Sequence, residues 1–182
     1  YYSIGEGVFD ETQYTGKEQD FVITEDGELI EYRGSDTEVV VPDGVTSIGT
    51  TFSGKTEIKT IVIPEGVLYI SKNAFKGCRN LTEVVIPDTV LEIGNRAFEG
   101  CCGITELIIP NSVVEIQAGA FAGMCSLEKL TVPFVGKNRE VKSDTEEAII
   151  GYWFDDFYYS GTDSFKGCAI RPNYVAQTHN NG

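Results

Sequence analysis

Proline recurs through this chain at a nearly constant interval. Five of its six prolines are separated by 22, 23, 23 and 23 residues, and they are Pro42, Pro64, Pro87, Pro110 and Pro133. A short aliphatic run precedes each one, as in VVVP and LIIP, which is typical of a β-strand that ends at a residue without an N–H group. A fixed period of this length is the signature of a solenoid. We therefore expect five short strands, one per turn, stacked in register as a parallel sheet.

Further apolar residues follow each proline at fixed offsets. In four successive copies a valine and an isoleucine are followed by a phenylalanine. A unit of 23 residues is too small to bury these groups alone, but stacked neighbours can bury them together. We expect each phenylalanine to lie against that of the adjacent turn. The predicted phenylalanine column is Phe52, Phe75, Phe98 and Phe121.

The two ends of the repeat array have different sequences. Residues from Phe21 to Gly34 alternate between apolar and polar around Asp26-Gly27, which predicts a β-hairpin that caps the first turn. Pro133 and Phe165 are 32 residues apart, where most earlier copies have 11, so the fifth repeat carries an insertion of 21 residues. We expect one structural domain made of an N-terminal segment with its cap (1–35), the repeats (36–133), and an extended last repeat with an irregular aromatic C-terminal cap (134–182).

The pattern L-x-x-[VL]-x-[IV]-P-x-x-V-x-x-I-x-x-x-A-F-x-G-C resembles the BspA-like leucine-rich repeat family of bacterial cell-surface proteins. The match covers Asp36 to Pro133 and returns at Phe165 to Cys168. The resemblance implies a right-handed leucine-rich repeat solenoid of the β-rich α/β type, here with about five 23-residue repeats and a parallel sheet on one face. It also implies export and display at the cell surface, with adhesion to host proteins or other cells as the proposed role of some members. The family has no catalytic motif to carry over.

The amino-acid composition of the chain disfavours some classes of binding partner. The chain has 28 acidic and 14 basic residues and a formal net charge of −14, which disfavours nucleic acid and anionic lipid surfaces. No apolar run approaches the roughly 20 residues needed to cross a bilayer, so we expect no membrane insertion by this segment. The chain starts at Tyr1-Tyr2 with neither an initiator Met nor a signal segment, so it resembles a processed piece whose export signal or anchor lies outside it. A secreted or cell-surface monomer is expected.

Two columns of strand residues are candidates for binding a protein. In leucine-rich repeats the outward residues of the strands line the concave face, and by this analogy the residues four before each proline form one column and those two before it form another. An exposed aliphatic column edged with carboxylates can be a binding surface, although it can also be a soluble sheet face without a partner. The candidates are Glu38, Thr60, Glu83, Glu106 and Lys129 in the polar column, and Val40, Val62, Val85, Ile108 and Thr131 beside them.

The aromatic half of the insertion is the other candidate surface. Its aromatics can anchor a protein or stack on sugars, but a solenoid must also close its C-terminal end, so a cap is the competing interpretation. A surface-exposed, non-catalytic module that adheres to host or bacterial surface proteins is the leading hypothesis. The alternatives are a carbohydrate-binding module that uses these aromatics and a structural spacer that displays another domain. The candidate residues are Tyr152, Trp153, Phe157, Tyr158 and Tyr159.

No residue pattern indicates catalysis, a metal or a cofactor. The single histidine, His179, lies in a polar tail, and the five cysteines recur a full turn apart rather than at the short spacing of a metal site. Glu83 and Glu106 lie on successive turns, but a flat sheet lacks the pocket in which a glycosidase shifts the pKa of one carboxyl. Cys102 and Cys125 are within disulfide reach, although side chains of one column point in parallel, which favours free thiols.

Overall fold

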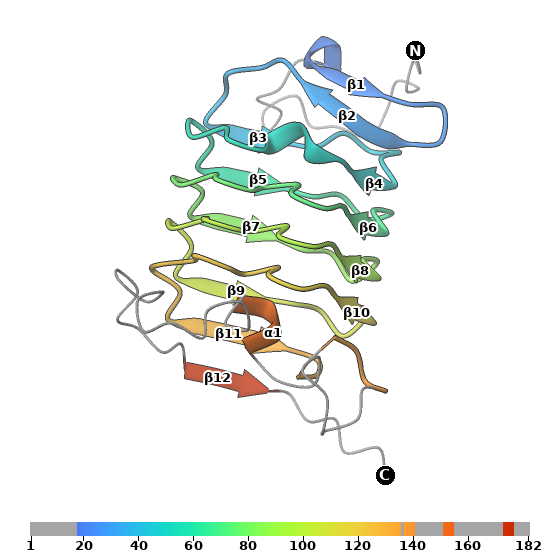
Figure 1. Cartoon of the computed structure of the whole chain (residues 1–182). Helices are drawn as coiled ribbons and strands as arrows, with labels where there is room; N and C mark the ends of the chain where they lie inside the picture. The colour runs from blue at the N-terminus through green and yellow to red at the C-terminus, as the bar shows by residue number, and fades with distance from the viewer. Residues whose placement is uncertain (1–17, 136, 141–150, 155–172, 177–182) are drawn as a thin grey trace.

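The computed structural model describes residues 18–135, 137–140, 151–154 and 173–176, and it is a stack of coils with two strands in each complete turn (Figure 1). The first row of strands holds the aliphatic runs before the prolines. All pairings within this row are parallel. The row consists of β3 (Glu38–Val40), β5 (Thr60–Val62), β7 (Glu83–Val85), β9 (Glu106–Ile108) and β11 (Lys129–Val132), with β12 (Asn173–Ala176) beyond β11.

This row is divided into two hydrogen-bonded ladders rather than one. The strand orders are β3-β5-β7 and β9-β11-β12, so in the described chain β7 and β9 follow one another in the stack without pairing. Val84, the inward residue of β7, is only half-buried, whereas the equivalent residues Val39, Ile61, Leu107 and Leu130 are buried. The ladder is therefore interrupted next to β7, the strand whose inward side chain is the least buried of the row.

A second row of short strands runs along the opposite side of the coil and was not predicted. Each strand in it is only two residues long and contributes a buried isoleucine to the core. The sheet has the order β1-β2-β4-β6-β8-β10, in which β1 (Phe21–Ile23) and β2 (Glu28–Tyr32) precede the first turn. It continues past the β7–β9 interruption and holds the turns together. The short strands are β4 (Ser47–Ile48), β6 (Tyr69–Ile70), β8 (Glu92–Ile93) and β10 (Glu115–Ile116).

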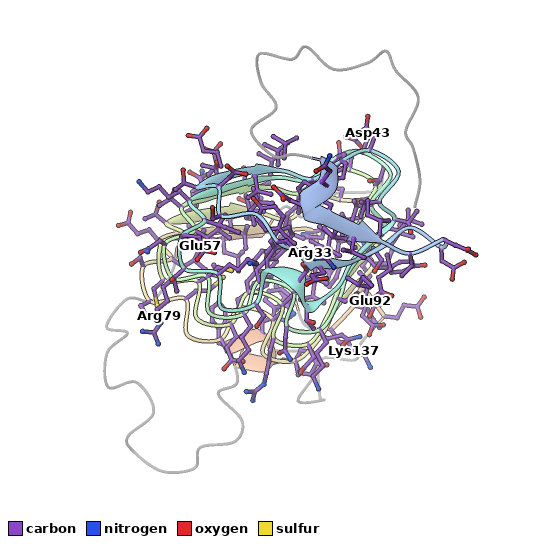
Figure 2. The ribbon with its side chains drawn as sticks, turned by 90° about the horizontal axis from the view of Figure 1, so that it is seen from above. Arg33, Asp43, Glu57, Arg79, Glu92 and Lys137 are labelled. Carbon is purple, nitrogen blue, oxygen red and sulfur yellow. The ribbon has the colours of Figure 1, made fainter. Side chains whose placement is uncertain are left out.

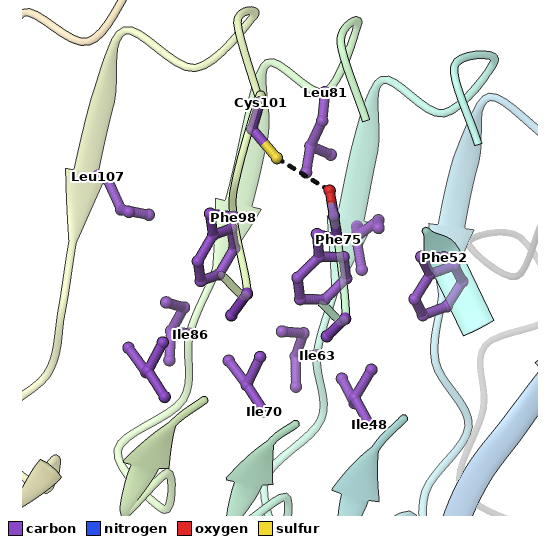
Figure 3. Packing of buried hydrophobic residues seen from close by; sticks show 14 of the residues in the cluster. Ile48, Phe52, Ile63, Ile70, Phe75, Leu81, Ile86, Phe98, Cys101 and Leu107 are labelled. Carbon is purple, nitrogen blue, oxygen red and sulfur yellow. Dashed lines mark hydrogen bonds between the residues drawn. The ribbon is translucent and has the colours of Figure 1, made fainter. Parts of the chain in front are cut away.

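The phenylalanine column is confirmed as the centre of the core (Figure 3). Phe52 stacks on Phe75, Phe75 on Phe98 and Phe98 on Phe121, with ring centroids 5.6, 5.1 and 6.2 Å apart. All four rings have no exposed surface. Because the rings of successive turns bury one another, each turn depends on its neighbours for stability and the turns are expected to fold together.

The hairpin predicted at the N-terminal end is confirmed. Strands β1 (Phe21–Ile23) and β2 (Glu28–Tyr32) pair antiparallel, and β2 also pairs with β4. The hairpin places the Tyr32 ring 5.6 Å from Phe52, with Phe21 packed on the other side of Tyr32. The phenylalanine column is thus covered at its first turn by aromatic rings of the hairpin. Short 3₁₀ segments precede β1 (Glu18–Asp20) and include Phe52 (Thr50–Phe52).

An aromatic segment closes the described part of the column at the other end. The short helix α1 (Gly151–Phe154) places Trp153 edge-on against Phe121, with centroids 5.9 Å apart, and Phe134 packs 6.4 Å from the same indole. The backbone continues the stack as well, because the N–H group of Phe121 donates to the carbonyl oxygen of Trp153. The predicted aromatic cap is therefore present, and Trp153 is its buried centre.

Candidate functional site

An aliphatic stripe runs along the outer side of the first row of strands. Val62, Val85 and Ile108 have 47%, 54% and 57% of their surface exposed, and Val40 is half-buried. Alternate residues of a strand point to opposite sides of the sheet, so burial of each middle residue turns these side chains outward. Val40, Val62 and Val85 are register partners, and Ile108 occupies the same position in the next turn. We call these four residues the aliphatic stripe.

The predicted polar column lies two residues earlier on the same outward side. Four of its members, Glu38, Glu83, Glu106 and Lys129, are exposed, and Thr60 is half-buried. The Lys129 Nζ atom lies 2.5 Å from Glu106 Oε1, so the acidic charge of Glu106 is balanced within the column. Glu38 and Glu83 are the other carboxylates of the column.

A second acidic edge borders the stripe on its other side and was missed in the sequence. The first three repeat prolines are followed by the exposed residues Asp43, Glu65 and Asp88, whereas Pro110 is followed by the neutral Asn111 and Pro133 by Phe134. Seen down the stack, Asp43 lies at an outer corner of the coil, just past β3 (Figure 2). The signal was present in the sequence as an acidic residue directly after each of the first three repeat prolines. The stripe thus lies between two rows that carry carboxylates.

Thr131 does not belong to the exposed surface, contrary to our expectation. Only 8% of its surface is exposed, although its register partner Ile108 on β9 exposes 57%. The strand that carries Thr131 pairs with β9 on one edge and with β12 on the other. The stripe therefore ends at Ile108. The pairing with β12 depends on residues that follow the insertion, so the repeat pattern alone could not reveal it.

Of the five aromatic candidates, the structure describes Tyr152 and Trp153. Trp153 is fully buried, so it is a core residue and not the ligand anchor that we considered. Tyr152 is half-buried, and its carbonyl oxygen accepts a hydrogen bond from the N–H group of Gly119 at 2.8 Å. Phe157, Tyr158 and Tyr159 lie outside the described residues, and their role in binding stays a prediction.

A second group of exposed apolar residues lies beside the second row of strands. Leu91 and Val114 directly precede β8 and β10, and the N–H group of Val114 donates to the carbonyl oxygen of Leu91. They differ from the stripe in their flanks, because the next residues, Glu92 and Glu115, are half-buried. These two positions provide a comparison surface of similar chemistry.

The described residues contain little that could support catalysis or hold a metal. Within them, no group of three or more His, Cys, Asp and Glu side chains is arranged to bind a metal ion. An open hollow of about 250 Å³ lies between the hairpin and the first turn, and it is lined in part by Asp26, Gly27 and Asp43. Neither Glu83 nor Glu106 lines it. Among the helices of the described chain, none is long and apolar enough to cross a membrane.

Comparison with known proteins agrees with this architecture. The family model described as "BspA type Leucine rich repeat region" matches residues 31–144 in six copies. The chain belongs to the BspA-type leucine-rich repeat family. The matched region contains the whole aliphatic stripe and both acidic edges, and it ends before the aromatic segment. A search of curated proteins finds no match.

Two solved structures of bacterial proteins, the first two described below, share the fold. The leucine-rich repeat protein of T. pallidum is 25% identical, with a TM-score of 0.51 over 65% of this chain and 71% of that one. The pneumococcal vaccine antigen PcpA is 23% identical, with a TM-score of 0.56 over 62% of this chain and 30% of that one. A leucine-rich repeat protein from Bacteroides ovatus is 24% identical, with a TM-score of 0.48 over 63% and 38% of the two chains.

Proposed function

We propose that this chain is a non-catalytic module that binds proteins on a host or bacterial surface through the aliphatic stripe. The observation that carries the proposal is a row of exposed aliphatic side chains on a face that is held rigid by the stack. Contiguous exposed apolar patches on soluble proteins often mark interaction sites. Membership of a family of bacterial repeat proteins supports an interaction role and a surface or secreted location.

The chemistry of the face indicates what the partner carries. Strands about 4.8 Å apart make the four-residue stripe roughly 14 Å long, which is too small to form a specific interface alone. The contact therefore extends over the two acidic edges. A partner with aliphatic side chains bordered by lysine or arginine matches both the stripe and its edges, and the chain's net charge of −14 would speed its approach.

The proposal is tested by a binding screen of the purified chain against extracellular-matrix proteins and glycans. We expect a protein ligand whose association slows at least tenfold when the salt concentration is raised, because the charges are exposed and screened. If glycans alone bind and raise the melting temperature, the chain is a carbohydrate-binding module and the proposal is wrong.

Charge substitution then locates the contact. The triple variant Glu65→Gln, Glu83→Gln and Asp88→Asn removes three carboxylates that border the stripe, and we expect the association rate to fall several-fold at low salt. A matched variant, Glu25→Gln, Asp26→Asn and Glu140→Gln, removes the same charge from exposed positions elsewhere. Equal effects of the two variants would show that only net charge matters and that the contact lies on another face.

A further inference from the structure

Two cysteines meet on the outside of successive turns. Cys102 and Cys125 are both half-buried, and their Sγ atoms lie 2.6 Å apart. This separation is well inside the roughly 3.5 to 4.0 Å at which even carbon atoms pack without a bond, and a thiol is only a weak hydrogen-bond donor. The contact is therefore too close for two thiols that merely touch.

The backbone holds the two turns at a spacing that suits a covalent link. On one side of the pair, the N–H group of Gly100 donates to the carbonyl oxygen of Ala122 at 2.8 Å. On the other side, the N–H groups of Glu128 and Lys129 both donate to the carbonyl oxygen of Thr105. Turns stacked about 4.8 Å apart fall within the Cα separation of about 4.4 to 6.8 Å that disulfides adopt.

A neighbouring pair of cysteines shows the contrasting arrangement. Cys78 and Cys101 point inward with no exposed surface, and their thiols donate to the carbonyl oxygens of Phe52 at 2.9 Å and Phe75 at 3.1 Å (Figure 3 shows the second bond). Burial raises the pKa of the Cys78 thiol to about 11 and that of Cys101 further. These two thiols are hidden from solution oxidants, whereas Cys102 and Cys125 are within their reach.

We propose that Cys102 and Cys125 are a site of covalent oxidation and form a disulfide that ties two successive turns together. The oxidant is a second disulfide, either on a protein or on a small molecule such as oxidised glutathione. The thiolate of one cysteine attacks the oxidant and forms a mixed disulfide, and one oxidant thiol leaves. The thiolate of the other cysteine then attacks the cysteine sulfur of this mixed disulfide. The Cys102–Cys125 bond forms, and the second oxidant thiol leaves. The pair loses two electrons and two protons, and the oxidant becomes two thiols.

A disulfide between Cys102 and Cys125 would constrain the two strands that follow these cysteines in the sequence. Cys102 lies four residues before Glu106, the first residue of β9, and Cys125 lies four residues before Lys129, the first residue of β11. Joining the two turns fixes the spacing of the strands that carry Ile108 and the Glu106–Lys129 ion pair. The inference itself rests on the cysteine geometry and is independent of the proposed function.

Peptide mapping of the full chain treated with oxidised glutathione tests the proposal. Cleavage at Glu106 and Glu115 separates the two cysteines, so we expect their fragments to remain joined until a reductant is added, with two of the five thiols protected from alkylation. Cys102→Ser should abolish the link, and the matched variant Cys101→Ser should keep it. Five reactive thiols after treatment, or a link from either cysteine to Cys168, would overturn the assignment.

Thermal melting provides a second measurement that does not depend on mapping. Closing a loop of this length in the unfolded chain should raise the melting temperature of the oxidised protein by roughly 10 °C over the reduced one. The Cys102→Ser variant should show no such difference between the two conditions. An equal difference in wild type and variant would assign the effect to other thiols and contradict the proposal.

Discussion

The phenylalanine column and the aliphatic stripe both recur with the 23-residue period of the repeat, but the column is buried and the stripe is exposed to solvent. The four phenylalanines have no exposed surface, whereas Val62, Val85 and Ile108 expose about half of theirs. Apolar residues in a core are explained by stability alone, whereas exposed Val and Ile side chains of a strand supply β-propensity and also offer an apolar surface to a partner. Recurrence therefore identifies columns, and burial separates those that hold the fold from those that are exposed to solvent.

The largest expected difference arises when the same charge is placed once in the buried column and once on the exposed stripe. Phe98→Asp inserts a carboxylate between the rings of Phe75 and Phe121, and we expect it to cost about 4 kcal/mol or more and to unfold the whole stack. Val85→Asp places the same charge on the stripe and should shift stability by roughly 0.5 kcal/mol. Circular dichroism melts of the two variants measure both effects. An unchanged melting temperature for Phe98→Asp would refute the column assignment.

The C-terminal end of the column should be nearly as sensitive. Trp153 is fully buried against Phe121 and Phe134, so Trp153→Ala should destabilise the chain by about 3 to 5 kcal/mol. Within the described residues the indole N–H group has no hydrogen-bond partner, so Trp153→Phe removes no bond there and should cost clearly less. Urea unfolding of both variants distinguishes a packed cap from an exposed aromatic. Equal and small losses would mean that Trp153 is not buried.

The N-terminal cap predicts a smaller, pH-dependent effect. Burial, aided by the hydrogen bond from the Tyr32 hydroxyl to Asp36, raises the pKa of Tyr32 to about 12 from its ordinary value of 10.0. The folded chain thus retains this proton more strongly than the unfolded chain, so the contribution is fully present below pH 10 and is lost as the pH rises toward 12.

Thermal melts between pH 9 and pH 12 measure this effect. Other groups also titrate in that range, so the comparison is with Tyr32→Phe, which removes the ionisable hydroxyl and keeps the ring on Phe52. We expect the wild-type melting temperature to fall more steeply than that of the variant. Parallel curves would show that the Tyr32 hydroxyl titrates as it does in the unfolded chain.

The sequence revealed the features that depend on the repeat and missed those that depend on contacts between distant segments. The phenylalanine column and the hairpin follow from fixed offsets and from alternation around Asp26-Gly27, and both are confirmed. The second sheet was missed because strands of two residues, such as Tyr69–Ile70, are too short to show a period. The Sγ contact between Cys102 and Cys125 depends on the side-chain directions of two turns, which a column alone does not specify.

The candidate surface was predicted in part for the same reason. Outward positions on β5, β7 and β9 follow from the two-residue period of a strand, so the exposure of Val62, Val85 and Ile108 could be predicted. Burial of Thr131 could not be predicted in this way, because its strand is the last of the regular repeats and pairs with β12, which lies beyond the insertion. Burial of Trp153 likewise depends on the return of the insertion over Phe121.

Binding by a stripe variant tests the central claim most directly. Val62→Thr, Val85→Thr and Ile108→Thr made together keep the shape of the face and its charges, and as surface changes they should alter stability by only about 1 kcal/mol in total. The matched control is Leu91→Thr with Val114→Thr, on the comparison surface. Titrated against the protein ligand found by the screen, the triple variant should bind at least tenfold more weakly and the control should bind like wild type. Full affinity in the triple variant would contradict the account and direct attention to the aromatic insertion.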